Sequence, residues 1–102
     1  MVYEVLISQV APERRTEYLK AYKRASRESY PPGCHELRLL SCIEDPGRVI
    51  TMIAWDSVDA HERARTRPEH ARFRDTVTPY RIGPGVGFAH YTYEDSAPPD
   101  WA

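Results

Sequence analysis

The chain has 102 residues, of which 41% are apolar and 28% charged, and its 14 Lys and Arg against 15 Asp and Glu leave a formal charge of -1. This length suits one domain around one core, and the balanced charge favours neither a nucleic acid nor an anionic membrane as a partner. No apolar run approaches the ~18 to 20 residues of a membrane span, and the first residues do not resemble a leader, so we expect a cytoplasmic protein.

The first predicted elements are a strand and a helix. Residues 2–10 alternate in hydrophobicity, as a half-buried strand does. Pro12 suits the first turn of a helix, and the apolar side chains after it recur at the spacing of one buried helical stripe. The stripe consists of Tyr18, Leu19, Tyr22, Ala25 and Ser29. Pro31, Pro32 and Gly33 end the helix, because proline removes a donor and disfavours helical geometry in the residue before it.

Residues 34–43 and 48–55 form the next predicted strands. Asp45, Pro46 and Gly47 between them are typical of a tight turn, so we expect these strands to pair as an antiparallel hairpin. The second strand is apolar on both faces, which is typical of a strand in the middle of a sheet.

Two helical segments are predicted after the hairpin. Asp56 or Ser57 can cap the first segment, which extends to about residue 65. Thr66 and Glu69 stand at the spacing of a capping box, which predicts that a second segment begins there and extends to about residue 78.

The last predicted strand covers residues 88–93, after a loop rich in proline and glycine. We therefore expect one domain over residues 1–93 and a tail over 94–102, in which Trp101 is the one large apolar side chain and which is either mobile or packed on a partner. Cys34 and Cys42 lie eight residues apart in one predicted strand, so they cannot bond each other and are expected to be free thiols.

The predicted order of elements, βαββαβ, is that of a ferredoxin-like α+β fold with one antiparallel sheet. The helices can cover only one face of this sheet. The other face is apolar and includes Leu40, Ile50, Met52 and Ala54. An apolar face of this size predicts a homodimer in which two sheets pack face to face.

Several short runs together carry a resemblance to a known family. They are Pro32-Gly33 before a strand, Ile53-Ala54-Trp55-Asp56-Ser57 followed by Ala60-His61, Pro68-Glu69-His70 with Phe73-Arg74, and Gly83-Pro84 leading to His90-Tyr91. With these runs the chain resembles the antibiotic biosynthesis monooxygenase family from about residue 2 to residue 93. The resemblance implies a dimeric α+β barrel. In one branch of the family it implies oxidation of phenolic anthrones or quinols by molecular oxygen without metal or flavin.

The resemblance also implies catalytic residues. The family's pocket tryptophan falls on Trp55 and its arginine on Arg74, whereas Thr51 replaces an amide and His61 replaces a tyrosine. The indole N–H of Trp55 suits a substrate carbonyl and Arg74 suits a phenolate or peroxide anion. The imidazole of His61, with an ordinary pKa near ~6.5, suits a base. Each side chain also has a structural interpretation: Trp55 as a core residue, Arg74 as a surface ion pair and His61 as an exposed polar residue.

The substrate-binding residues that we expect are Thr51, Tyr22, Tyr18, His70 and Phe73. No His or Cys pair has the spacing of a zinc site, and the glycines near residue 85 precede a strand, unlike a nucleotide-binding loop. The leading hypothesis is therefore a cofactor-independent monooxygenase of a small phenolic, quinol or polyketide-like substrate, with no metal and with oxygen as co-substrate. The alternatives are an aromatic polyketide cyclase on the same fold and a non-catalytic dimeric module that binds a small molecule.

Overall fold

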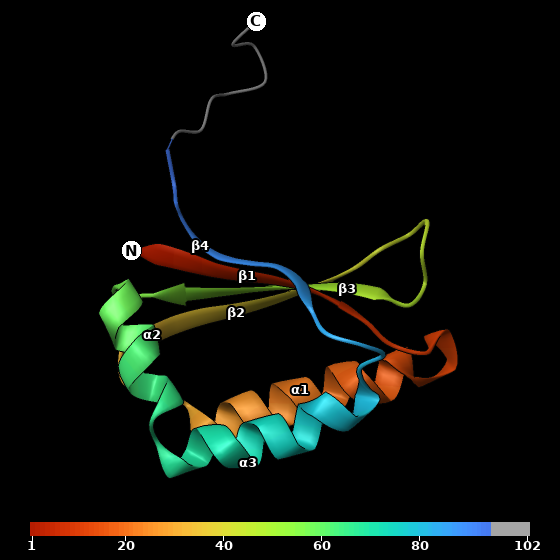
Figure 1. Ribbon diagram of the computed structural model, residues 1–102, viewed down its shortest axis with the longest axis horizontal. Helices are drawn as coiled ribbons and strands as arrows, with labels where there is room; N and C mark the ends of the chain where they lie inside the picture. The colour runs from red at the N-terminus through yellow and green to blue at the C-terminus, as the bar shows by residue number, and fades with distance from the viewer. Residues whose placement is uncertain (95–102) are drawn as a thin grey trace, which may run out of the picture.

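The computed structural model describes residues 1–94 and contains the predicted order of strands and helices (Figure 1). The strands are β1 (Val2–Gln9), β2 (Cys34–Ser41), β3 (Arg48–Trp55) and β4 (Val86–Thr92). The helices are α1 (Arg15–Ser29), α2 (Val58–Arg65) and α3 (Pro68–Val77), with short 3-10 turns η1 (Pro12–Arg14) and η2 (Thr78–Tyr80). Except for its first residue, the predicted tail of residues 94–102 lies outside the described residues and stays a prediction.

The strands form one antiparallel sheet in the order β2-β3-β1-β4. This is the ferredoxin-like arrangement that the order of elements predicts. The predicted hairpin of β2 and β3 is confirmed, since Leu40 pairs with Ile50 across it. β3 lies inside the sheet between β2 and β1, in agreement with its apolar side chains on both faces.

An edge bulge sets the register of β4. Val5 pairs with Ala89 and Ile7 with Val86, so β4 has one more residue than β1 between these pairs. Gly87 lies in the bulge with a φ of +67°, a conformation that glycine adopts without steric cost. β4 therefore begins two residues before the predicted strand, and the pairing of Glu4 with His90 places both side chains on one face.

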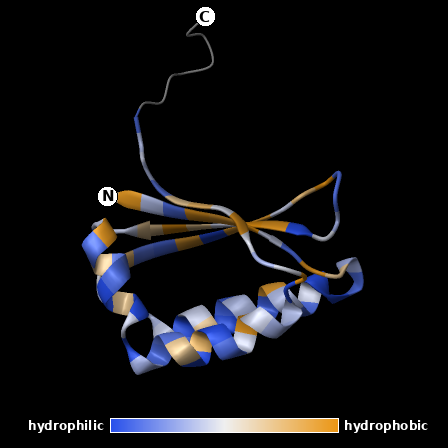
Figure 2. Cartoon of the chain, viewed as in Figure 1, coloured by the Kyte–Doolittle hydropathy of each residue, from blue (hydrophilic) through white to orange (hydrophobic). Residues whose placement is uncertain are grey.

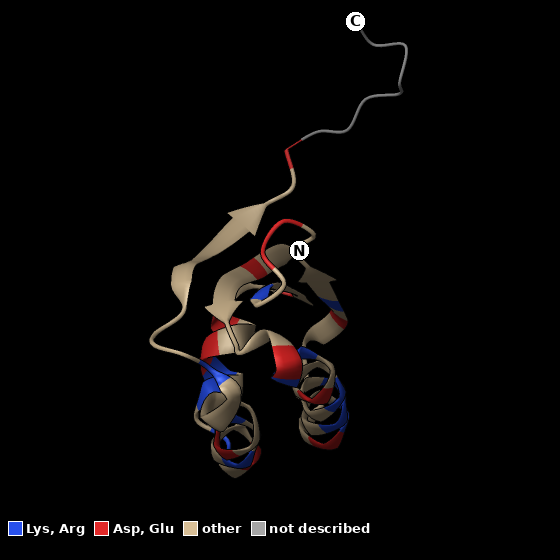
Figure 3. Ribbon diagram, turned by 90° about the vertical axis from the view of Figure 1, so that its right-hand side faces the viewer, with Lys and Arg blue, Asp and Glu red and all other residues tan. Residues whose placement is uncertain are grey.

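The helices cover one face of the sheet. α1 and α3 lie side by side beneath it in Figure 1, and the end-on view in Figure 3 shows the same two layers. Tyr18 and Tyr22 of α1 point at the sheet and pack against Val49 of β3 and Val77 of α3. The rings of Tyr22 and Phe73 meet edge to face, with their centroids 5.0 Å apart, and join the two helices.

The opposite face of the sheet is not covered by any described helix, and apolar residues recur along its strands (Figure 2). Ile7, Ile50 and Leu40 stand next to one another across three strands, and the Leu40 side chain is 46% exposed. Ala54 has the same parity as Ile50, as expected for this face, but it is buried by its neighbours. No helix among the described residues has the length and apolarity required to span a bilayer.

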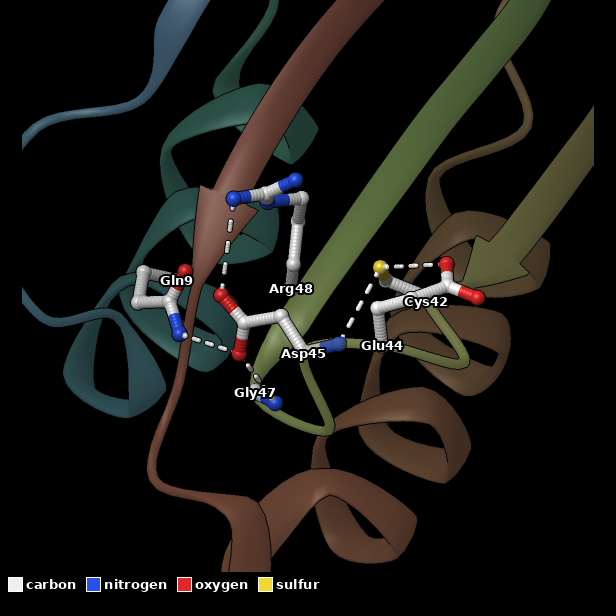
Figure 4. A network of polar contacts seen from close by, with 6 residues as sticks. All are labelled: Gln9, Cys42, Glu44, Asp45, Gly47 and Arg48. Carbon is white, nitrogen blue, oxygen red and sulfur yellow. Dashed lines mark hydrogen bonds and ion pairs between the residues drawn. The ribbon is translucent and has the colours of Figure 1, made fainter.

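The turn between β2 and β3 is longer than the predicted one, because β2 ends at Ser41. The Asp45 carboxylate accepts hydrogen bonds from Gln9 Nε2 at 3.2 Å and from the Gly47 backbone N–H at 3.1 Å (Figure 4). These hydrogen bonds, that of Gln9 first, lower the pKa of Asp45. A Cβ atom on Gly47 would lie 2.3 Å from the Val10 carbonyl oxygen, so the turn is closely packed against the end of β1.

The starts of the last helices differ in one respect from the prediction. Ser57 caps α2 as expected, because its Oγ accepts a hydrogen bond from the Ala60 N–H at 3.1 Å. The predicted capping box of Thr66 and Glu69 is wrong. The Thr66 hydroxyl instead donates to the Arg63 carbonyl at 2.8 Å, and α3 begins at Pro68 without a side-chain cap.

Candidate active site

A cavity of about 330 Å³ lies between the helix-covered face of the sheet and the three helices. Its walls are mainly apolar and aromatic. They include Tyr22 of α1, Leu37 of β2, Ile53 and Trp55 of β3, Ala64 of α2 and Phe73 of α3. The volume is at the lower end of the range of small-molecule sites, and apolar walls with few polar groups are typical of such sites.

A carboxylate and two rings form one cluster in the cavity lining. The Trp55 indole Nε1–H donates to Glu4 Oε1 at 3.0 Å, and His61 Nε2 lies 3.2 Å from the same oxygen. Trp55 and His61 are stacked, with ring centroids 4.8 Å apart and planes 18° from parallel. All three side chains line the cavity.

A second imidazole continues this cluster away from the cavity. His61 Nδ1 lies 2.7 Å from His90 Nε2, and His90 pairs with Glu4 across β1 and β4. His61 is held in place by α2, whose N-terminus is fixed by the Ser57 cap. Strand pairing and a capped helix thus bring together residues that are up to 86 positions apart, from Glu4 to His90.

Burial controls the ionisation of this cluster. The Glu4 side chain is 13% exposed, and desolvation raises the pKa of its carboxyl, although the Trp55 hydrogen bond and the nearby His90, Arg65 and Arg81 oppose this. Burial, followed by the charges of His90, Arg65 and His70, lowers the pKa of His61 to about 4. His61 is therefore neutral at pH 7, with one ring nitrogen as donor and one as acceptor.

The cationic side chains at the cavity are Lys23, Arg27 and Arg67. Arg67 is already engaged, since its Nε lies 3.3 Å from a Glu69 carboxylate oxygen and its Nη1 donates to the Ser29 carbonyl at 3.4 Å. Lys23 and Arg27 form no ion pair with any described residue. Within residues 1–94, no group of three or more His, Cys, Asp or Glu residues is arranged to hold a metal ion.

The structure brings most of the predicted site residues to one place. Trp55, His61, Tyr22, His70 and Phe73 all line the cavity. The remaining three do not line it. Tyr18 and Thr51 are buried in the layer between helix and sheet, and Arg74 is exposed on α3. The predicted roles of these residues in binding and catalysis stay predictions.

The sequence analysis did not identify Glu4 and His90 as a pair. The sequence does single out Glu4, because it is the one acidic residue in an otherwise apolar and neutral first strand. Its alternation with Leu6 and Ser8 places it on the same face of the strand as these two residues. His90 could not be placed on the same face, because its register depends on the bulge at Gly87.

A comparison of the sequence with family models identifies one family. The profile of the antibiotic biosynthesis monooxygenase family matches residues 1–76. A comparison with curated proteins finds no relative. Among solved structures, a candidate antibiotic biosynthesis monooxygenase from Bordetella bronchiseptica is 23% identical with a TM-score of 0.83, and the alignment covers 91% of this chain and 96% of that one.

Two further solved structures have the same fold. One is SnoaB from Streptomyces nogalater, described as a cofactor-independent oxygenase; it is 19% identical, with a TM-score of 0.78, and the alignment covers 95% of this chain and 96% of the other. The other is a candidate antibiotic biosynthesis monooxygenase from Nitrosomonas europaea, 18% identical with a TM-score of 0.74, with 91% and 98% covered. At these identities the likeness concerns the fold.

Proposed function

Because the chain belongs to the antibiotic biosynthesis monooxygenase family, we propose that it is a cofactor-independent monooxygenase that oxidises a small phenolic, quinol or polyketide-like aromatic compound with molecular oxygen. The observation that carries this proposal is the cavity, whose aromatic walls end at the cluster of Glu4, Trp55 and His61. An aromatic substrate fits such walls, and a proton acceptor at one end is what this chemistry requires.

The reaction needs no redox-active protein group. Loss of a proton makes an electron-rich hydroxyaromatic compound reactive toward oxygen, and exclusion of water protects the anion that is formed. In the oxidation of an activated CH₂ group to a carbonyl, one oxygen atom enters the product. The other oxygen atom leaves as water with both hydrogens. The protein therefore has to remove a proton, stabilise the anion and orient the ring.

The side chains around the cavity match these tasks. Tyr22 and Phe73 provide walls for an aromatic ring, and Lys23 and Arg27 supply positive charge for an oxyanion. Trp55 contributes its ring face, since its single N–H is already bonded to Glu4. Arg74, which the family resemblance assigns to the oxyanion, is exposed outside the cavity, so its role requires a direct test.

We further propose that the protein acts as a homodimer in the cytoplasm. The uncovered apolar face of the sheet, with Ile7, Ile50 and Leu40 in one row, supports packing of sheet against sheet. Cys34 and Cys42 are both free thiols, which suits a reducing compartment.

Oxygen uptake is the decisive measurement. The wild type, Trp55→Phe, Arg74→Ala and Lys23→Met are supplied with a panel of hydroxyanthrones and quinols in metal-chelated buffer, with Glu62→Gln on the exposed side of α2 as the control. We expect uptake by the wild type and the control, and reduced uptake by Trp55→Phe and Lys23→Met. Substrate conversion without uptake would favour a cyclase, and no conversion across the panel would favour a binding module. Equal rates for the wild type and Arg74→Ala would remove the role implied for Arg74.

A further inference from the structure

Both ring nitrogens of His61 are occupied by protein groups. Nε2 faces Glu4 Oε1 at 3.2 Å and Nδ1 faces His90 Nε2 at 2.7 Å. A neutral imidazole has one N–H and one lone pair. If Nε2 carries the hydrogen, it donates to the Glu4 carboxylate, and Nδ1 accepts from the N–H of His90. No lone pair of His61 is then left for a substrate proton.

Glu4 is arranged differently. The Trp55 N–H donates to Oε1 and His61 Nε2 lies 3.2 Å from the same oxygen, whereas Oε2 forms no hydrogen bond with any residue in the described part of the chain. The side chain lines the cavity and is 13% exposed. A carboxylate held at one oxygen keeps the lone pairs of the other available to a bound molecule.

We propose that Glu4 is the catalytic base, with Oε2 as the atom that accepts the substrate proton, and that His61 and His90 are positioning residues that orient Oε1. This inference rests on the proposed oxygenase function, which it deepens by naming the group that starts the reaction. It assigns to Glu4 the proton transfer that the family resemblance suggested for His61.

The proton transfer balances without another reactant. The acidic C–H or O–H bond of the substrate breaks, an Oε2–H bond forms, and the electron pair stays on the substrate as a carbanion or phenolate. Glu4 becomes a neutral acid while His61 and His90 keep their protons. After oxygen has added to the substrate anion, Glu4 returns the proton to the peroxide oxygen and is a carboxylate again.

The environment of Glu4 suits this role. Desolvation raises the pKa of the carboxyl, which makes the carboxylate a stronger base than an exposed one. Trp55 of β3 and His61 of α2 contact the carboxylate, and the other titratable groups near it are Arg65 of α2, Arg81 after η2, His90 of β4, Tyr22 of α1 and Cys34 of β2. The Trp55 N–H holds Oε1, with His61 Nε2 3.2 Å from it, and Oε2 is left without a protein donor among the described residues.

His70 is the other imidazole at the cavity and is the main competitor as base. It belongs to α3 and stacks on Phe73, with ring centroids 6.1 Å apart. Burial lowers its pKa, which makes it a weaker base than an exposed imidazole. His70→Gln therefore serves as the comparison variant in the tests that follow.

The first test needs no substrate. Nitrogen-15 NMR of the free wild-type protein at pH 7 reports which nitrogen of His61 carries the hydrogen. We expect a neutral ring with the hydrogen on Nε2. A hydrogen on Nδ1 would overturn the proposal, because Nε2 would then accept from a protonated Glu4, and a protonated carboxyl cannot act as the base.

The second test follows proton removal in the absence of oxygen. A hydroxyanthrone in D₂O is incubated anaerobically with each protein, and NMR follows deuterium exchange at its acidic CH₂ group. We expect Glu4→Gln to slow the enzyme-dependent exchange by about 10² to 10⁴-fold, the usual contribution of a general base. Glu4→Asp should retain more exchange than Glu4→Gln, Glu62→Gln should equal the wild type, and His90→Gln should displace the pH profile of the exchange.

The outcomes of these tests distinguish the assignment of Glu4 as the base from the proposed oxygenase function. Wild-type exchange rates in Glu4→Gln, or a larger loss in His70→Gln, would overturn the assignment of Glu4 while the oxygenase proposal stands. If deuterium exchange depends on Glu4 but the wild type takes up no oxygen in air, the oxygenase proposal is overturned and the assignment of Glu4 as base stands. Absence of exchange in the folded wild type would overturn the assignment as well. Circular dichroism and thermal unfolding confirm that each variant is folded.

Discussion

Replacement of His61 by glutamine should change how the stability of the protein depends on pH. The His61 ring is 4% exposed and its pKa falls from 6.5 to about 4 in the folded state. Between these values the unfolded chain binds a proton that the folded chain does not, so the free energy of unfolding decreases as the pH falls. Since each tenfold change in proton affinity is worth about 1.36 kcal/mol, the loss due to His61 is about 3 kcal/mol by pH 4.

Glu4 opposes this effect. Its pKa is raised in the folded state, so the folded chain binds a proton before the unfolded chain does, and the cost of its buried charge disappears as the pH falls. In the wild type, the free energy of unfolding therefore changes less with pH than it would if His61 alone titrated. Other charged groups near His61 are His90, Arg65 and His70. The contribution of His61 is best measured in a Glu4→Gln background.

Urea denaturation from pH 4 to 8 provides the test. We expect the free energy of unfolding of Glu4→Gln to fall by about 3 kcal/mol between pH 6.5 and pH 4 relative to Glu4→Gln/His61→Gln. A variant at a side chain that cannot titrate provides the control, because Glu4→Gln/Ile43→Gln, at a residue that is 90% exposed, should follow Glu4→Gln across this range. If removal of His61 leaves the pH dependence unchanged, His61 is not held neutral in the folded protein, and the hydrogen-bonding argument for Glu4 loses its basis.

Three other substitutions test separate parts of the structure. Trp55→Phe removes the N–H that donates to Glu4 at 3.0 Å, so we expect a loss of about 1 to 3 kcal/mol in urea denaturation and a raised Glu4 pKa by carbon-13 NMR. Ile50→Glu places a charge in the uncovered sheet face and should convert a dimer to a folded monomer in sedimentation velocity, whereas Ile43→Glu, at a side chain that is already 90% exposed, should not. Gly47→Ala brings a Cβ to 2.3 Å from the Val10 carbonyl oxygen and should lower thermal stability by about 1 to 3 kcal/mol, while an unchanged melting temperature would show that the turn can relax.

The fold was predictable because each element has a strong local signal. β3 has the predicted bounds, since its apolar run is preceded by a turn and followed by the Ser57 cap. The paired prolines after α1 and the turn before β3 fix where the chain reverses. The weaker details depend on contacts that no local pattern reports. Thr66 bonds back to Arg63 instead of capping α3, and the bulge at Gly87 starts β4 early.

The positions of site residues could be predicted where these residues lie on elements that follow one another directly in the chain. Trp55 and His61 belong to β3 and the helix directly after it, so their proximity follows from the chain order. Arg74 shows the limit of the helical pattern. Phe73 faces the cavity, and a step of one residue turns a side chain by about 100° around the helix, which leaves Arg74 in solvent.

Glu4 and His90 show why the pairing of distant strands matters more for this site than any motif. A carboxylate in an apolar strand is costly to bury unless donors meet it. Here Trp55 of β3 donates to Glu4, His61 of α2 lies 3.2 Å from the same oxygen, and His90 of β4 contacts the other ring nitrogen of His61. Desolvation raises the pKa of Glu4, whereas the Trp55 hydrogen bond and the charges of His90, Arg65 and Arg81 oppose this and favour the ionised form. A carboxyl balanced between these effects can accept a proton from a substrate and give it back, which is the property that a base used twice in one reaction requires.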